Sequence, residues 1–218
     1  MLKFSTGNRK INDLAKDLGL SKKEVVAFDL PAGYTCPAAD ICKSQANREN
    51  GKITDGENCQ FRCYAASTES VFTTVRNLRW HNYSELTNSE NMVKLISDSI
   101  NSKIKVIRIH SSGDFFSKAY FQAWVKVAEL HPEVTIFGYT KVLPYVKAQK
   151  PENFKLVYSH GGIFDNKVTN EPVSYVVASE NQAIGSLPCK DNPAGDFYEI
   201  MKGNSFSLLI HGTQPAKA

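Results

Sequence analysis

Residues 104–114 read IKVIRIHSSGD, a run rich in β-branched side chains that ends in a turn of small and polar residues. β-Branched residues favour strands, whereas Ser, Gly and Asp favour turns. The same pattern of a short apolar run and a stop occurs five more times in the chain. The six predicted strands cover residues 25–30, 104–110, 134–139, 154–160, 174–179 and 205–211.

Stretches of helical periodicity lie between these strands and cover residues 64–82, 88–101, 117–130 and 142–149, whereas 182–203 is ambiguous. Thr87 with Asn88, and Ser117, are suitable N-cap residues for the second and third helices. Alternating strands and helices indicate an α/β fold with a mostly parallel sheet, and six such units favour a partial (βα)6, TIM-like barrel. A Rossmann fold is not favoured because no Gly-x-Gly-x-x-Gly motif follows the first strand.

The composition is that of an ordinary globular protein, with 218 residues of which 42% are hydrophobic and 22% are charged. We expect one α/β domain over residues 1–218. The sequence has neither an apolar run of about 20 residues nor the core of a signal peptide, so we expect no membrane contact and a cytoplasmic location. The net charge is +4 with scattered basic residues, so nucleic acid is not an expected partner, and Arg76 and Arg79 are assigned to a solvated helix face.

Four of the five cysteines lie in the loop 31–66 that follows the first predicted strand. Cys36, Cys42, Cys59 and Cys63 have the spacing C-x5-C-x16-C-x3-C. In a reducing compartment, clustered thiols indicate a metal centre more often than disulfides. Structural zinc sites usually contain C-x2-C pairs, which are absent here, so we favour a 4Fe–4S cluster over zinc and over free cysteines. Cys189 stands alone and is interpreted as a structural thiol.

Polar residues also gather where predicted strands end, which is where ligands bind in parallel α/β folds. A histidine there could ligate a metal, donate a proton or contact a substrate, or only hydrogen-bond to the neighbouring backbone. An acidic side chain beside backbone amides could bind an amino group or a ribose hydroxyl. The candidate residues are His110, His160 and His211, each the last residue of a strand, and the turn residues Ser112, Gly113 and Asp114.

Cysteines after the first strand and a Gly-acid turn after the second resemble the partial (βα)6 barrel of radical S-adenosylmethionine enzymes. In that superfamily a C-x3-C-x2-C loop holds three irons of a 4Fe–4S cluster, and a Gly-Gly-Glu-like turn holds the methionine amino group. By position, Ser112, Gly113 and Asp114 would form that turn. Here Cys59 and Cys63 have the C-x3-C spacing, but no third cysteine follows two residues later. The resemblance therefore implies S-adenosylmethionine binding only if one iron stays open.

Several longer motifs are similar to those of a family of uncharacterised, phage-encoded, cysteine-containing proteins of similar length. The similarity covers nearly the whole chain and implies a viral protein that acts in the cytoplasm of an infected host cell. It does not assign an activity. The motifs are LPAG at 30–33, TCP at 35–37, FRCYA at 61–65, RWHN at 79–82, SGDFF at 112–116, YTK at 139–141 and HGTQP at 211–215.

Three functional hypotheses follow from these patterns. In the first, all four clustered cysteines bind a 4Fe–4S cluster with a redox, sensing or structural role, and the partner is an unknown redox protein or small molecule. In the second, three cysteines bind the cluster and its open iron takes S-adenosylmethionine, as in a radical-type enzyme. In the third, zinc stabilises a module that binds nucleic acid or protein.

Overall fold

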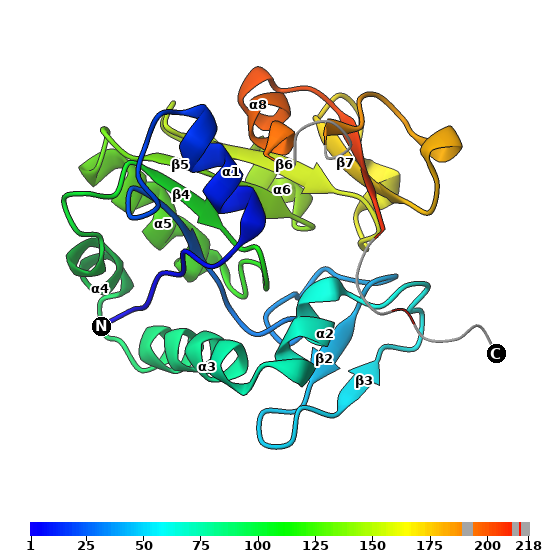
Figure 1. The fold of residues 1–218 in the computed structure, drawn as a ribbon, viewed down its shortest axis with the longest axis horizontal. Coiled ribbons are helices and arrows are strands. Elements are labelled where there is room, and N and C mark those ends of the chain that lie inside the picture. Colours follow the sequence, from blue (N-terminus) through cyan, green and yellow to red (C-terminus); the bar gives the residue numbers. More distant parts are fainter. Residues whose placement is uncertain (189–193, 211–213, 215–218) are drawn as a thin grey trace.

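Six parallel strands form one curled sheet, a half-barrel, in a computed structural model that describes residues 1–188, 194–210 and 214 (Figure 1). Their order in the sheet follows their order in the sequence, as expected for successive right-handed βα units. All six predicted strands are confirmed, with slightly different ends. They are β1 (Val25–Phe28), β4 (Val106–Ile109), β5 (Thr135–Thr140), β6 (Phe154–Ser159), β7 (Val173–Val177) and β8 (Phe206–Leu209).

The four predicted helical stretches are also helical in the structure, although residues 64–82 are divided into two helices at Phe72. Ser117 is an N-cap as predicted, but the helix expected from residue 88 begins at Met92 with Asn91 as its cap. The helices are α1 (Arg9–Asp17), α2 (Tyr64–Val71), α3 (Thr73–Thr87), α4 (Met92–Ser99), α5 (Lys118–Leu130), α6 (Leu143–Lys147) and α8 (Gly195–Lys202), with short 3-10 helices η1 (Asp165–Lys167) and η2 (Glu180–Gln182).

The two faces of the sheet bury different apolar clusters because neighbouring side chains of a strand point to opposite faces. On the outer face, Ile107 and Ile109 of β4 belong to a cluster with Trp124 of α5, which is fully buried. On the inner face, the cluster contains Leu14 of α1 and Phe197 of α8. The helices α1 and α8 therefore cover the inside of the half-barrel, away from the carboxyl ends of the strands.

The loop 31–66, here called the cysteine loop, contains a small antiparallel hairpin that the sequence did not predict. Its strands are β2 (Ser44–Ala46) and β3 (Ile53–Asp55), and both contact α2. In Figure 1 the hairpin and α2 lie together at the opposite side of the molecule from α1 and α8. The cysteine loop is thus a folded unit rather than an irregular connection.

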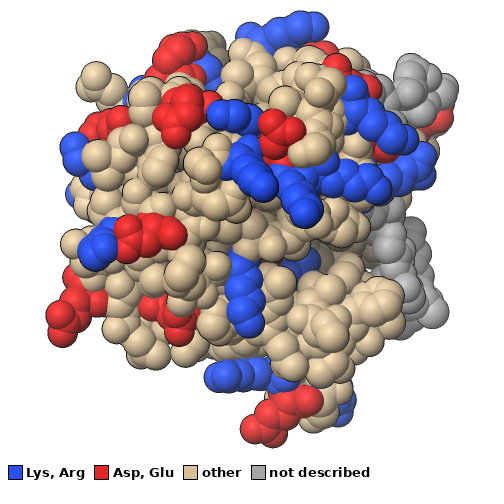
Figure 2. Space-filling view, turned by 60° about the vertical axis from the view of Figure 1, so that its left-hand side comes forward, with Lys and Arg blue, Asp and Glu red and all other residues tan. Residues whose placement is uncertain are grey.

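The charged side chains are distributed unevenly on the face shown in Figure 2. Lys and Arg side chains gather in its upper part, with acidic side chains next to several of them. The basic residues that are scattered along the sequence therefore gather in part in three dimensions. Among the residues that the structure describes, no helix has both the length and the apolar character needed to cross a membrane.

The start of α5 allows a direct test of helix capping. The Oγ of Ser117 accepts a hydrogen bond from the backbone N–H of Tyr120 at 3.2 Å, which satisfies one of the free donors of the first turn. We expect Ser117→Ala to lower the free energy of unfolding by about 1 kcal/mol, measured by urea denaturation. Ser102→Ala, in an exposed turn, is the control, and equal losses in the two variants would contradict the capping role.

Candidate functional site

The cysteine loop lies over the carboxyl ends of the strands and is fastened to two of the turns that follow them. Where it leaves β1, the N–H of Leu30 donates to the carbonyl of Ser112 at 3.0 Å. Further along, Ala39 pairs with Gly162, in the turn after β6. These backbone contacts hold the cysteines above the edge of the sheet at which parallel α/β folds bind ligands.

Between the cysteine loop and the strand ends is a cavity of about 1040 Å³, including the space at its open mouth. Cys36, Cys42 and Cys63 line it from the loop side. From the sheet side it is lined by charged and polar residues of β4 to β7 and by aliphatic residues of β7 and β8.

The three thiols that line the cavity lie close enough to influence one another. Burial raises the pKa of Cys36 and Cys63, and raises that of Cys42 to about 11. Negative charge on Asp114, Cys63 and Cys42 raises the pKa of Cys36 further. Negative charge on Cys63, Cys59 and Asp114 likewise raises the pKa of Cys42, so Cys59 is also close enough to influence this group. Without a cation or metal to compensate, these thiols are therefore protonated near neutral pH.

Two local features favour the ionised form of particular cysteines. The ammonium group of Lys141 acts against the increase in the pKa of Cys42. Cys63 is the N-cap residue of α2, where the backbone amides of Ala65 and Ala66 oppose the effect of burial on its pKa. Helix N-termini favour negative charge, so Cys63 is well placed to act as a thiolate ligand.

Cys59 differs from the other three because it is not among the residues that line the cavity. Its Sγ donates to the carbonyl of Phe61 at 3.2 Å and lies 3.5 Å from the Oγ of Ser44. Among the described residues, no three His, Cys, Asp or Glu side chains are grouped tightly enough to share one metal ion. The predicted role of Cys189 falls outside the described residues.

Asp114 lines the cavity as expected, but its carboxylate is engaged by two backbone amides. One oxygen accepts from the N–H of Phe115 at 2.7 Å, and the other accepts from the N–H of Lys141 at 2.9 Å. Burial raises the pKa of Asp114, and these hydrogen bonds act in the opposite direction. Asp114 therefore joins the ends of β4 and β5 in addition to facing the cavity.

Ser112 and Gly113 also line the cavity, and both contact the start of the cysteine loop. The Oγ of Ser112 donates to the carbonyl of Leu30 at 2.8 Å. Gly113 has a φ of +84°, and a Cβ added to it would lie 2.5 Å from the Oγ1 of Thr35. The turn that the sequence suggested as a ligand-binding motif is thus packed directly against the loop that carries the cysteines.

The strand-end histidines have different environments. His110 lines the cavity, and its backbone has a φ of 62°. The Nε2 atom of its ring forms a hydrogen bond with the hydroxyl of Tyr120 at 2.9 Å. Burial lowers the pKa of His110 to about 3, so the ring is neutral at pH 7. His160 does not line the cavity, and its Nε2 lies 3.3 Å from Asp165. His211 falls outside the described residues.

The family model for Gene product 88 matches residues 2–212, which include all four clustered cysteines and the strand ends. This chain belongs to the Gene product 88 family. It is 35% identical over 115 residues to the Gene 88 protein of Mycobacterium phage D29 and 31% identical to that of Mycobacterium phage L5. Each alignment covers 46% of this chain and 48% of the relative. The expected relationship to a phage family is thereby confirmed.

The chain spans about half the length of the curated Gene 88 relatives that it matches. No solved structure matches it. The curled half-barrel is described from this structure itself, and the likeness to radical S-adenosylmethionine enzymes stays a prediction.

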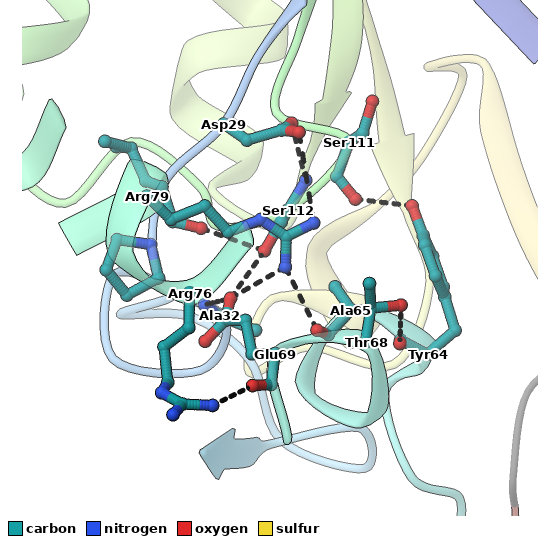
Figure 3. A network of polar contacts seen from close by, with 12 residues as sticks. Asp29, Ala32, Tyr64, Ala65, Thr68, Glu69, Arg76, Arg79, Ser111 and Ser112 are labelled. Carbon is teal, nitrogen blue, oxygen red and sulfur yellow. Dashed lines mark hydrogen bonds and ion pairs between the residues drawn. The ribbon is translucent and has the colours of Figure 1, made fainter. Parts of the chain in front are cut away.

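In this Gene product 88 protein, a buried network of charges joins the cysteine loop to α2, α3 and the turn after β4 (Figure 3). Glu69 of α2 accepts from the Nη1 of Arg79 at 2.8 Å and from the N–H of Ala32 at 2.9 Å. The Oγ of Ser112 lies 3.2 Å from the same carboxylate, and the Nη2 of Arg79 lies 3.9 Å from Asp29. The network fixes the base of the loop against the sheet.

The interpretation of Arg76 and Arg79 as residues of a solvated helix face was wrong, because both are buried. Arg76 donates to the carbonyl oxygens of Arg48 and Glu69, and Arg79 takes part in the charge network. Sequence periodicity identifies a buried helix face by its apolar residues. A buried face that is built from paired charges therefore has the same sequence pattern as a solvent-exposed face.

Arg108 of β4 is a site residue that the sequence analysis missed. It lines the cavity although it is 5% exposed, and its Nη2 lies 3.4 Å from the carboxylate of Asp196 in α8. Its guanidinium also lies 5.4 Å from the centre of the Tyr139 ring. The only available signal was a charged residue inside an otherwise buried strand, which is uncommon unless that residue has a partner.

Proposed function

We propose that this chain binds one 4Fe–4S cluster in the cavity, held by Cys36, Cys42 and Cys63. The observation that carries the proposal is that three thiols line one wall of a single cavity, at the carboxyl ends of the strands. Thiolates are the usual ligands of iron–sulfur clusters. The wide spacing of the cysteines in the sequence, without C-x2-C pairs, supports a larger group over a single zinc ion.

The surrounding charges support this assignment because a cluster requires ionised thiols. Lys141 and the first turn of α2 favour the thiolates of Cys42 and Cys63, respectively. Cys36 has no comparable cation among the influences on its pKa, so its ionisation depends most on the bound metal. When bound, the cluster would supply electron transfer, while the protein holds it and limits its access to water.

Cys59 decides between two versions of this function. Its hydrogen bond to Phe61 and its place outside the cavity wall favour three thiolate ligands over four. One iron would then be open to a small molecule, and S-adenosylmethionine is the candidate that the radical-enzyme resemblance and the half-barrel suggest. If Cys59 also ligates, a closed cluster with a redox, sensing or structural role is the alternative.

The test is anaerobic reconstitution of the full chain, with iron, sulfide and zinc measured on the same sample. We expect about four irons and four sulfides per chain, with visible charge-transfer absorption. Each of Cys36→Ser, Cys42→Ser and Cys63→Ser is expected to lose most of this iron, because one iron atom of the cluster loses its cysteine ligand. Cys59→Ser and the control Cys189→Ser are expected to retain it.

Each alternative gives a different result in the same experiment. Loss of iron from Cys59→Ser equal to the other losses would indicate four ligands and the closed cluster. About one zinc per chain without sulfide would refute the proposal and leave the thiols as a structural clamp. With three ligands, adding S-adenosylmethionine is expected to change the paramagnetic resonance spectrum of the reduced cluster.

A further inference from the structure

The inner part of the cavity, here called the floor, is formed by the strand residues Arg108, Tyr139, Ser159 and Ser174. Arg108 is the one charged residue among these four, and the ammonium group of Lys141 lies 3.2 Å from the Oγ of Ser159. The Nε of Arg108 is buried and has no hydrogen-bond partner among the described residues. A buried charged donor without a partner is costly, which makes this N–H a candidate to bind a ligand.

The charges around the floor do not balance. Arg108 and Lys10 share one carboxylate, that of Asp196, at 3.4 and 2.9 Å. The hydroxyl of Tyr139 donates to the same carboxylate at 2.5 Å. Two cations and one anion leave a local excess of one positive charge at this carboxylate. The other cations that line the cavity have acidic neighbours, because Arg62 pairs with Asp55 and Lys141 lies near Asp114. Because burial weakens screening by water, this excess favours an anionic ligand.

Hydroxyl groups and an aliphatic wall complete the floor. The Oγ of Ser159 accepts from Lys141 at 3.2 Å, which leaves the serine proton available for donation. Ser174 is almost fully buried and lines the same space. Val176 and Leu208 of the last two strands line the adjacent wall. The cavity therefore offers donors for an anionic group beside a surface for an apolar one.

We propose that the floor binds the carboxylate or phosphate group of a small molecule, with Arg108 as the charged donor and Ser159 and Ser174 as neutral donors. The apolar part of the molecule lies along Val176 and Leu208. The inference rests on the proposed function in one respect, because the molecule shares the cavity with the cluster. Binding of the anionic group itself depends on the floor and not on the thiols.

The test uses the full chain, freed of metal with a chelator, at constant ionic strength. The probes are inorganic phosphate, hexanoate and the uncharged hexanol. Binding of each probe is measured by calorimetric titration and by the shift of the thermal unfolding midpoint. We expect saturable binding of phosphate or hexanoate, whichever group the floor fits, and none of hexanol. Arg108→Gln is expected to weaken that binding by about tenfold or more, whereas Lys126→Gln, on the exposed side of α5, leaves it unchanged.

The inference is overturned if neither anion binds saturably, or if folded Arg108→Gln binds as well as the wild type. If circular dichroism shows that Arg108→Gln does not fold, Ser174→Ala decides: weaker binding supports the subsite and unchanged binding refutes it. Iron content is measured separately. A protein that takes up the cluster but binds no anion refutes only this inference, and one that binds the anion but no cluster refutes only the proposed function.

Discussion

Replacing Gly113 with alanine is expected to lower the free energy of unfolding by about 3 kcal/mol or more. The residue has a φ of +84°, which costs a residue with a side chain about 1–2 kcal/mol. Its Cβ would also lie 2.5 Å from the Oγ1 of Thr35 and 2.7 Å from the Cβ of Leu30. Overlap in a packed region adds about 1–3 kcal/mol. Urea denaturation monitored by tryptophan fluorescence measures the loss.

A matched control separates these two contributions. Gly203, at the end of α8, has a φ of +73°, and a Cβ added to it would meet nothing within 4 Å. Gly203→Ala therefore carries the backbone cost without the overlap, and we expect a loss of about 1 kcal/mol. Equal losses at the two positions would show that the cysteine loop can move away from the turn after β4. The close packing of Thr35 and Leu30 against Gly113 would then not be essential.

The strands of the half-barrel could be predicted because each is a local signal, a β-branched run followed by a turn. The helix α1 could not, because it buries only Ile11, Leu14 and Ala15 in a mostly polar segment. The hairpin of β2 and β3 was missed for a related reason. Its strands have three residues each, too few to show alternation, and its packing against α2 leaves no periodic pattern in the sequence.

The candidate site was predictable to the extent that its residues are close in sequence. The spacing of the cysteines placed them in one loop, but only the folded chain separates Cys59 from the three that line the cavity. Arg108 acquires its partner from Asp196, which is distant in the sequence. The orientation of such a side chain depends on helices that arrive later in the chain, so no local pattern could assign it.

Replacing Arg79 with methionine is expected to lower the free energy of unfolding by about 3–5 kcal/mol at pH 7. The guanidinium lies 2.8 Å from the carboxylate of Glu69 and 3.9 Å from that of Asp29, and all three side chains are buried. Removal of the cation leaves two buried carboxyl groups without their counter-charge, a change that costs this much in other buried pairs. Lys126→Met, which breaks the exposed pair with Glu129, is the control and is expected to cost less than about 1 kcal/mol.

The loss of unfolding free energy in Arg79→Met should also depend on pH, because the two carboxyl groups titrate. Burial already raises the pKa of Asp29 and Glu69, and Arg79 opposes that increase. Without Arg79 both pKa values rise further, so the folded variant binds more protons than its unfolded chain, whose carboxyl groups titrate at about 4. Stability then falls as the pH rises from that value through the folded pKa. The deficit of the variant is therefore largest at pH 8 and shrinks as the pH is lowered to 5.

Urea denaturation of wild type and variant at pH 5, 6, 7 and 8 measures this dependence. The double variant Arg79→Met/Glu69→Gln provides a second check, because it removes one of the two uncompensated carboxyl groups while keeping an acceptor for the N–H of Ala32. Its loss should be smaller than the sum of the two single losses. A deficit that is constant from pH 5 to pH 8, together with additive losses, would mean that Arg79 stabilises the protein by packing alone. The network would then position the cysteine loop by shape rather than by charge.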